Sequence, residues 1–207
     1  MFSALLTAGS VKQIMNTNLI LKNVSKHINL DQTEIDFFIS LLEYRKIKKK
    51  ELIIREGDVV RHDHFVLQGC FKTYSVDDKG DEHIIMFAPE DWWTGDLYSF
   101  LTERPSGFYT EALEDSEILQ ISKTNHEILY DKVPKFERFF RIIFQNALVT
   151  QFNRIDQNLS MTADEKYLEF RIKYPQLEQR LPQKQIAAFL GITPEFLSMI
   201  RRKMMTK

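Results

Sequence analysis

Cysteine is almost absent from this sequence, because Cys70 is the only one among 207 residues. A single thiol cannot form a disulfide within the chain, and an iron–sulfur cluster needs several cysteine ligands. We therefore expect neither a disulfide framework nor an iron–sulfur cluster. A chain without disulfides fits the reducing cytoplasm.

Long apolar runs are missing as well. No stretch approaches the roughly 18 consecutive apolar residues that a membrane-spanning helix requires. The opening stretch, MFSALLTAGSVKQIM, has a short apolar patch, but no basic residue precedes it, and an export signal needs one. We expect a loose N-terminal arm over residues 1–17, no membrane contact, and translation that starts at Met1 or Met15.

Catalytic motifs are absent too. The sequence has no nucleophile elbow, no phosphate-binding loop and no His/Glu motif with zinc spacing, so an enzyme or a metal site is the least favoured reading. The net charge of -1 argues against a protein that coats nucleic acid along its whole length. Basic residues nevertheless gather near the C-terminus, where Glu195 alone opposes Lys184, Arg201, Arg202, Lys203 and Lys207.

This basic end carries two short helical patterns. Apolar residues three and four apart give residues 183–190 one apolar face, and Gly191 can close that helix in a left-handed conformation. Thr193 and Pro194 then supply an N-cap and a first helical residue, and the second apolar face consists of Phe196, Leu197 and Ile200. Such a pair predicts a helix-turn-helix, whose second helix enters the DNA major groove. The alternative is an ordinary helical hairpin with a solvated basic end.

The longest helical pattern begins at Pro134. Large apolar side chains recur along it every three or four residues, at Phe140, Phe144, Leu148, Phe152, Ile155 and Leu159. A seam of about five turns is typical of a helix that pairs with another helix, while a second apolar strip would face the protein's own core. We predict a dimerisation helix over residues 134–160. The alternative is that both strips are buried within one chain.

Residues 44–122 alternate short strand-like runs with turn signals. Residues 46–54 indicate a strand, a turn and a strand, and residues 64–76 and 82–87 indicate a hairpin, with a glycine interrupting its first run. The expected fold is α+β: an antiparallel β-roll of the double-stranded β-helix or jelly-roll type with flanking helices. We place this roll at residues 18–133 and the helix-turn-helix domain at residues 161–207.

The order of these parts resembles the Crp/Fnr family of bacterial transcription regulators. The resemblance covers roughly Asn18 to Met204 and is carried by Glu56-Gly57-Asp58, Phe65-Val66-Leu67-Gln68-Gly69, Gly95-Asp96-Leu97, Glu111-Ala112-Leu113 and residues 186–200. The sequence ITPEFLSMIRRKM resembles that of the branch common in Bacteroidetes-type members of the family. The family implies a cyclic-nucleotide-binding-like roll, a long dimer helix and a winged helix-turn-helix.

In this family, the stretch that matches residues 93–108 is the phosphate-binding cassette for a cyclic nucleotide. The effector-binding residues that the resemblance implies are Gly95, Asp96, Leu97, Arg104, Ser106 and Gly107. Ser106 stands where the family has its arginine, and Arg104 lies two residues earlier. A phosphate without that guanidinium would lose a bidentate charge-assisted contact, which argues against cyclic AMP and leaves the effector unknown. The tryptophan pair at 92–93 is expected either to line a ligand pocket or to pack in the core.

The family's base-reading positions fall on Pro194, Glu195, Ser198 and Met199. Glu195 can accept a hydrogen bond from a cytosine amino group, whereas Met199, where arginine is common, offers only apolar contact to a thymine methyl. The complete expected DNA-binding set is Gln183, Lys184, Thr193, Pro194, Glu195, Ser198, Met199, Arg201 and Arg202, with the two arginines on phosphates. The chain reaches Lys207 too soon for the usual β-wing, so we expect a truncated or absent wing.

Together these expectations describe a cytoplasmic homodimeric transcription regulator that binds a palindromic site in double-stranded DNA, with half-sites about one helical turn apart. Its partners would be DNA, a second copy of the chain, a small-molecule effector and RNA polymerase. The competing hypothesis is a cyclic-nucleotide or other small-ligand-binding module that no longer reads DNA. Met199, the missing wing and the near-zero net charge favour that alternative.

Overall fold

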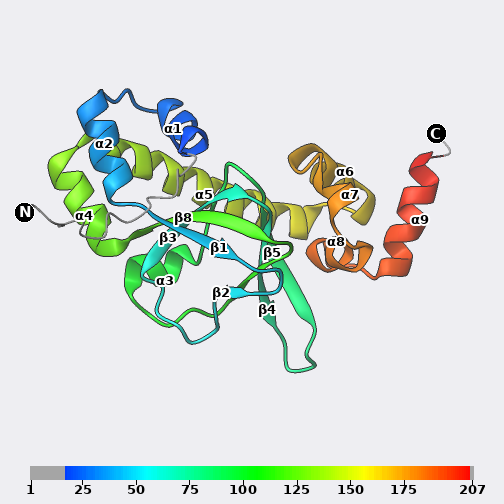
Figure 1. Ribbon diagram of the computed structural model, residues 1–207. Coiled ribbons are helices and arrows are strands. Elements are labelled where there is room, and N and C mark those ends of the chain that lie inside the picture. Colours follow the sequence, from blue (N-terminus) through cyan, green and yellow to red (C-terminus); the bar gives the residue numbers. More distant parts are fainter. Residues whose placement is uncertain (1–16, 206–207) are drawn as a thin grey trace, which may run out of the picture.

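The computed structural model describes residues 17–205 (Figure 1). Residues 1–16 of the predicted arm, with both candidate start residues, lie outside the described residues, as does Lys207, whereas Thr17 precedes α1. The helices are α1 Asn18–Ser25, α2 Gln32–Ser40, α3 Leu97–Thr102, α4 Lys123–Lys132, α5 Lys135–Ser160, α6 Ala163–Lys173, α7 Leu177–Arg180, α8 Gln183–Leu190 and α9 Pro194–Met205. The strands are β1 Glu43–Ile47, β2 Leu52–Ile54, β3 His62–Gln68, β4 Phe71–Val76, β5 Glu82–Ala88, β6 Trp93–Thr94, β7 Tyr109–Ala112 and β8 Ser116–Ser122. Along this part of the chain, no helix is long and apolar enough to cross a membrane.

Several helix boundaries follow from capping residues that the sequence displays. Asp31 and Thr162 each form a capping box with a glutamate three residues on, Glu34 and Glu165, at the starts of α2 and α6. Gly191 ends α8 with a φ of 70° in the left-handed region, as predicted. These local signals place the helices without help from the rest of the fold.

The strands form two four-stranded sheets, in the orders β1-β8-β3-β6 and β2-β7-β4-β5, and their neighbours pair antiparallel. The antiparallel roll and the β4–β5 hairpin are therefore confirmed. The strand, turn and strand predicted over residues 46–54 are present. The two strands do not pair with each other, because β1 pairs with β8 and β2 pairs with β7 in the other sheet. Asp115 holds the turn that changes sheets, accepting from Lys48 Nζ and Lys49 N, both at 2.9 Å.

Gly69 divides the predicted strand 64–76 into β3 and β4. Its φ of +95° is one that residues with a side chain rarely adopt, and a Cβ there would collide with Ser116. The Gly69 N–H donates to Glu90 Oε1 at 2.9 Å. The break sends β3 and β4 into different sheets, so this glycine starts the second layer of the roll.

Helices α1, α2, α4 and α5 lie over one side of the roll, and α6–α9 lie at its end beside β5 (Figure 1). On one side, α1, α2, α4 and the first half of α5 enclose an apolar cluster with β3 and β8. Its fully buried rings include Phe65, Phe136 and Phe139. A separate cluster fills the space between the sheets. Burial of this much aromatic surface supplies most of the driving force for the fold.

The C-terminal helices α6–α9, here called the head, pack directly against that end of the roll. Phe87 of β5 shares an apolar cluster with Tyr174 and Phe189 of the head, and the ring centroids of Phe87 and Phe189 are 5.2 Å apart. Arg154 of α5 donates to the carbonyl oxygens of Ile84 at 2.9 Å and Phe189 at 2.7 Å. The roll, the long helix and the head therefore meet in one place.

A second link between the head and the roll is an ion-pair cluster. Arg180 of α7 donates to the carboxylate of Glu90 from Nη1 at 2.9 Å and from Nη2 at 3.0 Å, and it also contacts Glu114. This forked geometry fixes direction as well as distance. Cys70 is buried nearby, and burial raises the pKa of its thiol to about 12, so the thiol stays protonated and unreactive at neutral pH.

Candidate functional site

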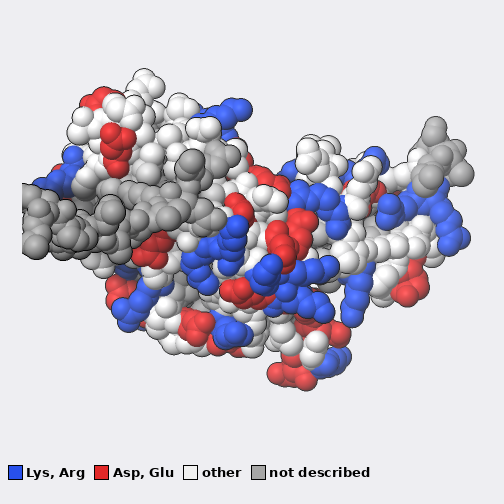
Figure 2. Space-filling view, in the orientation of Figure 1, with Lys and Arg blue, Asp and Glu red and all other residues white. Residues whose placement is uncertain are grey.

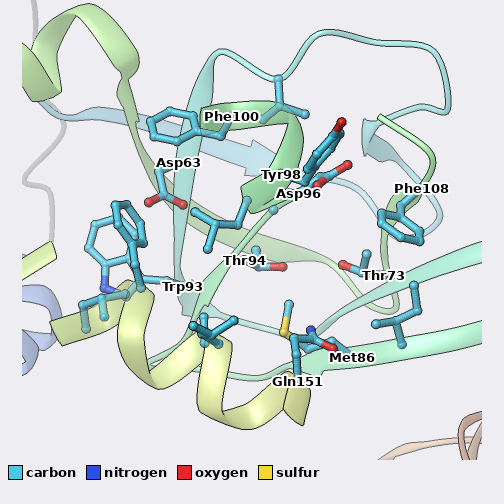
Figure 3. Close-up of a pocket in the computed structure, with 18 of the residues that line it drawn as sticks. Asp63, Thr73, Met86, Trp93, Thr94, Asp96, Tyr98, Phe100, Phe108 and Gln151 are labelled. Atoms are coloured by element: carbon cyan, nitrogen blue, oxygen red, sulfur yellow. The ribbon is translucent and has the colours of Figure 1, made fainter. Parts of the chain in front are cut away.

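A cavity of about 340 Å³ lies between the β-roll and the middle of α5, beside α3 (Figure 3). The predicted Gly95, Asp96 and Leu97 all lie in its wall. The rest of the lining is mostly apolar and includes Val60, Trp93, Phe100, Phe108, Ile143 and Phe144. Trp93 therefore lines a pocket, while its neighbour Trp92 packs against Tyr174 of the head, with the ring centroids 5.5 Å apart.

Asp96 is buried at the start of α3, and both of its carboxylate oxygens already hold protein donors. Oδ1 accepts from Ser99 N at 3.2 Å, and Oδ2 accepts from Ser106 Oγ at 2.8 Å. The Ser106 hydroxyl also accepts from Phe108 N at 3.1 Å. These bonds close the loop between α3 and β7, so Asp96 serves here to shape the loop.

The remaining predicted effector residues lie away from the cavity wall. Ser106 is buried behind Asp96, and Gly107 is exposed. Arg104 is exposed and reaches only the rim, where Nη1 donates to the hydroxyl of Tyr98 at 3.4 Å. Within the described residues, the wall contains no lysine or arginine. The cavity therefore offers no lysine or arginine side chain to bind a phosphate.

Asp63 of β3 is the other acid of the cavity wall. Its Oδ2 is buried and has no hydrogen-bond partner in the described part of the chain, and the same holds for Thr94 Oγ1 in the same wall. Burial raises the pKa of Asp63 to about 7. Figure 3 shows its carboxyl between the rings of Phe100 and Trp93.

Helix α9 lies at one end of the molecule, far from the cavity (Figure 1). Leu197 and Ile200 are buried in the cluster shared with α8, which confirms the packing of the helix pair. Glu195, Met199 and Arg202 are exposed, and their spacing of four and three places them on one face. Figure 2 shows lysine and arginine side chains gathered around this end.

Several of the predicted DNA-binding groups have partners inside the chain. Gln183 Nε2 donates to Ser198 Oγ, itself a predicted group, at 2.7 Å, and Arg201 Nη2 lies 3.6 Å from Glu178 Oε1. Phe196, expected in the apolar core, is 43% exposed, because its position on the helix turns it away from α8. Around the turn, the predicted residues that are exposed or half-buried are Lys184, Thr193 and Pro194.

The predicted seam of α5 divides into two groups. Four of its side chains are 55–84% exposed: Leu148, Phe152, Ile155 and Leu159. Phe144 is half-buried beside the cavity. Phe140 is 1% exposed, because its ring packs in the chain's own core against His126, with the ring centroids 4.1 Å apart. The prediction that Phe140 contacts a partner is therefore wrong.

Comparison with known proteins supports the arrangement. The cyclic nucleotide-binding domain family matches residues 44–132, from β1 to the end of α4. The regulatory protein HlyX of Actinobacillus pleuropneumoniae is 26% identical over 82% of this chain and 75% of that protein. The fumarate and nitrate reduction regulatory protein of Vibrio cholerae is 26% identical over 69% of this chain and 55% of that protein. The solved structure of the c-di-GMP responsive global regulator CLP of Xanthomonas campestris aligns with a TM-score of 0.67 at 14% identity, over 85% of this chain and 92% of that one.

These likenesses support a regulator of the Crp/Fnr family. The solved structure shares the fold, and the matched domain is the β-roll that holds the cavity. Two features depart from the Crp/Fnr pattern given above. Ser106, at the position of the family's arginine, is bonded to Asp96. Beyond Ser122, every element of the described residues is a helix, so no wing strand follows α9 within them.

Sequence reasoning missed Asp63, a carboxyl group in the cavity wall. Asp63 alternates along β3 with Phe65 and Leu67, which pack toward the helices. Alternate residues of a strand share a face, so a carboxylate in register with Phe65 was a signal of a buried acid. The exposure of Phe196 was missed because an apolar side chain beside Leu197 was expected to lie in the core.

Proposed function

We propose that the chain is a homodimeric transcription regulator that binds a two-fold-symmetric DNA site through α9. One observation carries the proposal: the exposed face of α9 presents Glu195, Met199 and Arg202 together, while the opposite face anchors the helix in the head. Side chains of this mixture can meet a base amino group, a thymine methyl and a phosphate. The family resemblance supplies the docking mode.

The dimer would form through the exposed seam of α5. Leu148, Phe152 and Ile155 present apolar surface on neighbouring turns, and a single copy of the chain leaves that surface in water. Pairing two such helices about a two-fold axis would relate the two heads by that axis, as a palindromic site requires. RNA polymerase would then be the further partner, and the bacterial cytoplasm the compartment.

Finer assignments belong to the same proposal. The sequence of residues 192–204 favours the branch of the family common in Bacteroidetes-type members. The effector would occupy the cavity beside α3, and the cassette geometry favours a molecule other than cyclic AMP, because Asp96 and Ser106 bind each other. We place the protein outside the enzymes, since its relatives are named as regulators.

Selection of bound fragments from random DNA tests the proposal. We expect an enriched palindrome with half-sites about one helical turn apart. Arg202→Ala should weaken binding to all sequences and reduce the slope of log affinity against log salt by about two per dimer, because each protomer loses about one phosphate contact. The matched control is Lys79→Ala, in the exposed β4–β5 turn far from α9.

The competing function is a ligand-binding module that no longer reads DNA. The partners of Gln183 and Arg201 inside the head favour it, because both side chains would have to leave them to reach DNA. Absence of any enriched palindrome at low salt, with a folded dimeric protein, would decide for this alternative.

A further inference from the structure

The wall of the cavity beside α3 contains polar atoms that the protein leaves unsatisfied. Among the described residues, neither Asp63 Oδ2 nor Thr94 Oγ1 has a hydrogen-bond partner, and Thr94 is only 3% exposed. Buried polar atoms are almost always bonded, if not by the protein then by water or a bound molecule. Both atoms belong to residues of the cavity wall, so a molecule inside the cavity can supply the missing bonds.

The wall contains two carboxyl groups and no strongly basic side chain. Asp63 is a carboxyl group in a largely apolar setting; His62 lines the cavity beside it, and no lysine or arginine of the described chain does. The second acid, Asp96, already holds two donors. A bound phosphate or carboxylate would meet Asp63 with no lysine or arginine to offset the repulsion. A cation would instead pair with it.

The surroundings of Asp63 favour a cation that carries hydrocarbon. The carboxyl lies between the rings of Phe100 and Trp93 (Figure 3), and aromatic faces attract cations when water is excluded. Phe144 and Ile143 of α5 extend the apolar wall. The volume of about 340 Å³ is at the lower end of the range for ligand pockets, about 300–1,000 Å³, which fits a small molecule.

We infer that this cavity binds a small apolar amine, whose ammonium group donates a hydrogen bond to Asp63 Oδ2 while its hydrocarbon part packs against Trp93, Phe100 and Phe144. The inference deepens the proposed function by giving the chemical class of the effector. It also connects effector binding with the proposed dimer contact, because Leu148 belongs both to the cavity wall and to the exposed seam.

Calorimetric titration of the full chain without DNA tests the inference. The probes are phenylbutylamine, phenylbutanol, phenylbutanoate and cyclic AMP, at pH 8, where Asp63 with a pKa of about 7 is mostly ionised. We expect the amine to bind at least about tenfold more tightly than the alcohol, because a charge-assisted bond is roughly twice as strong as a neutral one. The carboxylate and cyclic AMP should bind more weakly than the alcohol.

Asp63→Asn should lower the amine affinity by at least about tenfold and leave the alcohol affinity within about threefold. Asp78→Asn, which removes an exposed carboxylate in the β4–β5 turn, should change neither. Ala147→Phe adds a ring to the cavity wall and should weaken the amine and the alcohol together. If Asp63→Asn does not fold, the ranking on the unaltered chain and the Ala147→Phe result still decide.

Three results would overturn the inference: no binding of the amine, binding of the carboxylate or cyclic AMP as tight as that of the amine, or an amine preference that survives in Asp63→Asn. These results are separable from the fate of the proposed function. Amine binding without a selected DNA palindrome would support the amine site and contradict the proposed function as a DNA-binding regulator. A selected palindrome without amine binding would support the proposed function and contradict the amine site.

Discussion

Helix α5 has large apolar side chains along its whole length, yet its two halves have opposite surroundings. In the first half, Phe136, Phe139 and Phe140 are at most 1% exposed, whereas in the second half Phe152 and Leu159 are 61% and 84% exposed. In both halves, large apolar side chains recur within one helical turn of one another. The first half has α1, α2 and α4 packed over it, and the second half has no such cover in the described chain. Periodicity therefore identifies an apolar face without saying which molecule covers it.

The cavity lies where these halves join. Ile143, Phe144, Ala147 and Leu148 belong to its wall, between the buried rings and the exposed seam. Packing in protein cores is normally dense, so a space at this point of the helix distinguishes a binding site from a continuous core. The following predictions test whether the two halves of α5 differ in this way.

Phe139→Ala should have the largest effect on the stability of the protomer. The ring is 0% exposed, so its loss should lower the free energy of unfolding by about 3–5 kcal/mol. Phe152→Ala is the matched control on the same helix and should cost the isolated protomer less than about 1 kcal/mol. Urea unfolding at low protein concentration measures both, and equal losses would show that the halves do not differ.

Phe152→Glu should have the next largest effect, on assembly. A charge at the centre of the exposed seam should raise the dissociation constant of a dimer by about a hundredfold or more, because each copy places it in the apolar contact. Analytical ultracentrifugation should find monomers with an unchanged helix content. Asn146→Glu, an exposed position off the seam, should leave the assembly intact. If both variants keep the oligomeric state of the original chain, the seam is not the interface.

The parts of the fold that the sequence predicts are those with local causes. Asp31, Thr162 and Gly191 set helix ends through bonds to nearby residues, and Gly191 ends its helix in the predicted conformation. Strand pairing depends on distant residues. The pairing of β1 with β8 joins Glu43 to Gln120, and no local pattern distinguishes that partner from the adjacent strand β2.

The candidate site divides in the same way. Gly95 and Asp96 are recognisable from their order along the chain, and they do lie in the cavity wall. Whether Asp96 points to a ligand or to Ser106 depends on a loop closed over ten residues. Asp63 enters the site because β3 and α5 meet in space, and such a meeting leaves no motif in the sequence. Phe140 was predicted to contact a partner because its packing against the chain's own core also depends on residues distant in the sequence.

Asp63→Asn should have the smallest of these effects on stability, with an opposite sign. Burial raises the pKa of Asp63 to about 7, above the value of about 3.9 in an unfolded chain. Between these two values the folded state binds more protons, so this group's contribution to stability is complete below about pH 4 and is lost as the pH rises through about 7. Asparagine cannot ionise and does not lose stability in this way.

The expected gain for Asp63→Asn is about 2 kcal/mol at pH 8, roughly half of the full linkage value because water that enters the cavity screens the charge. Urea unfolding of both proteins at pH 5 and pH 8 measures it. His64 and His126, whose pKa values burial lowers to about 3 and about 4, give the opposite slope in both proteins and cancel in the difference. Tyr130, whose pKa is raised by burial and then by the charge of Asp63, stays neutral throughout. Identical pH dependence in the two proteins would mean that Asp63 is solvated, and the junction of the two halves of α5 would then be ordinary packing.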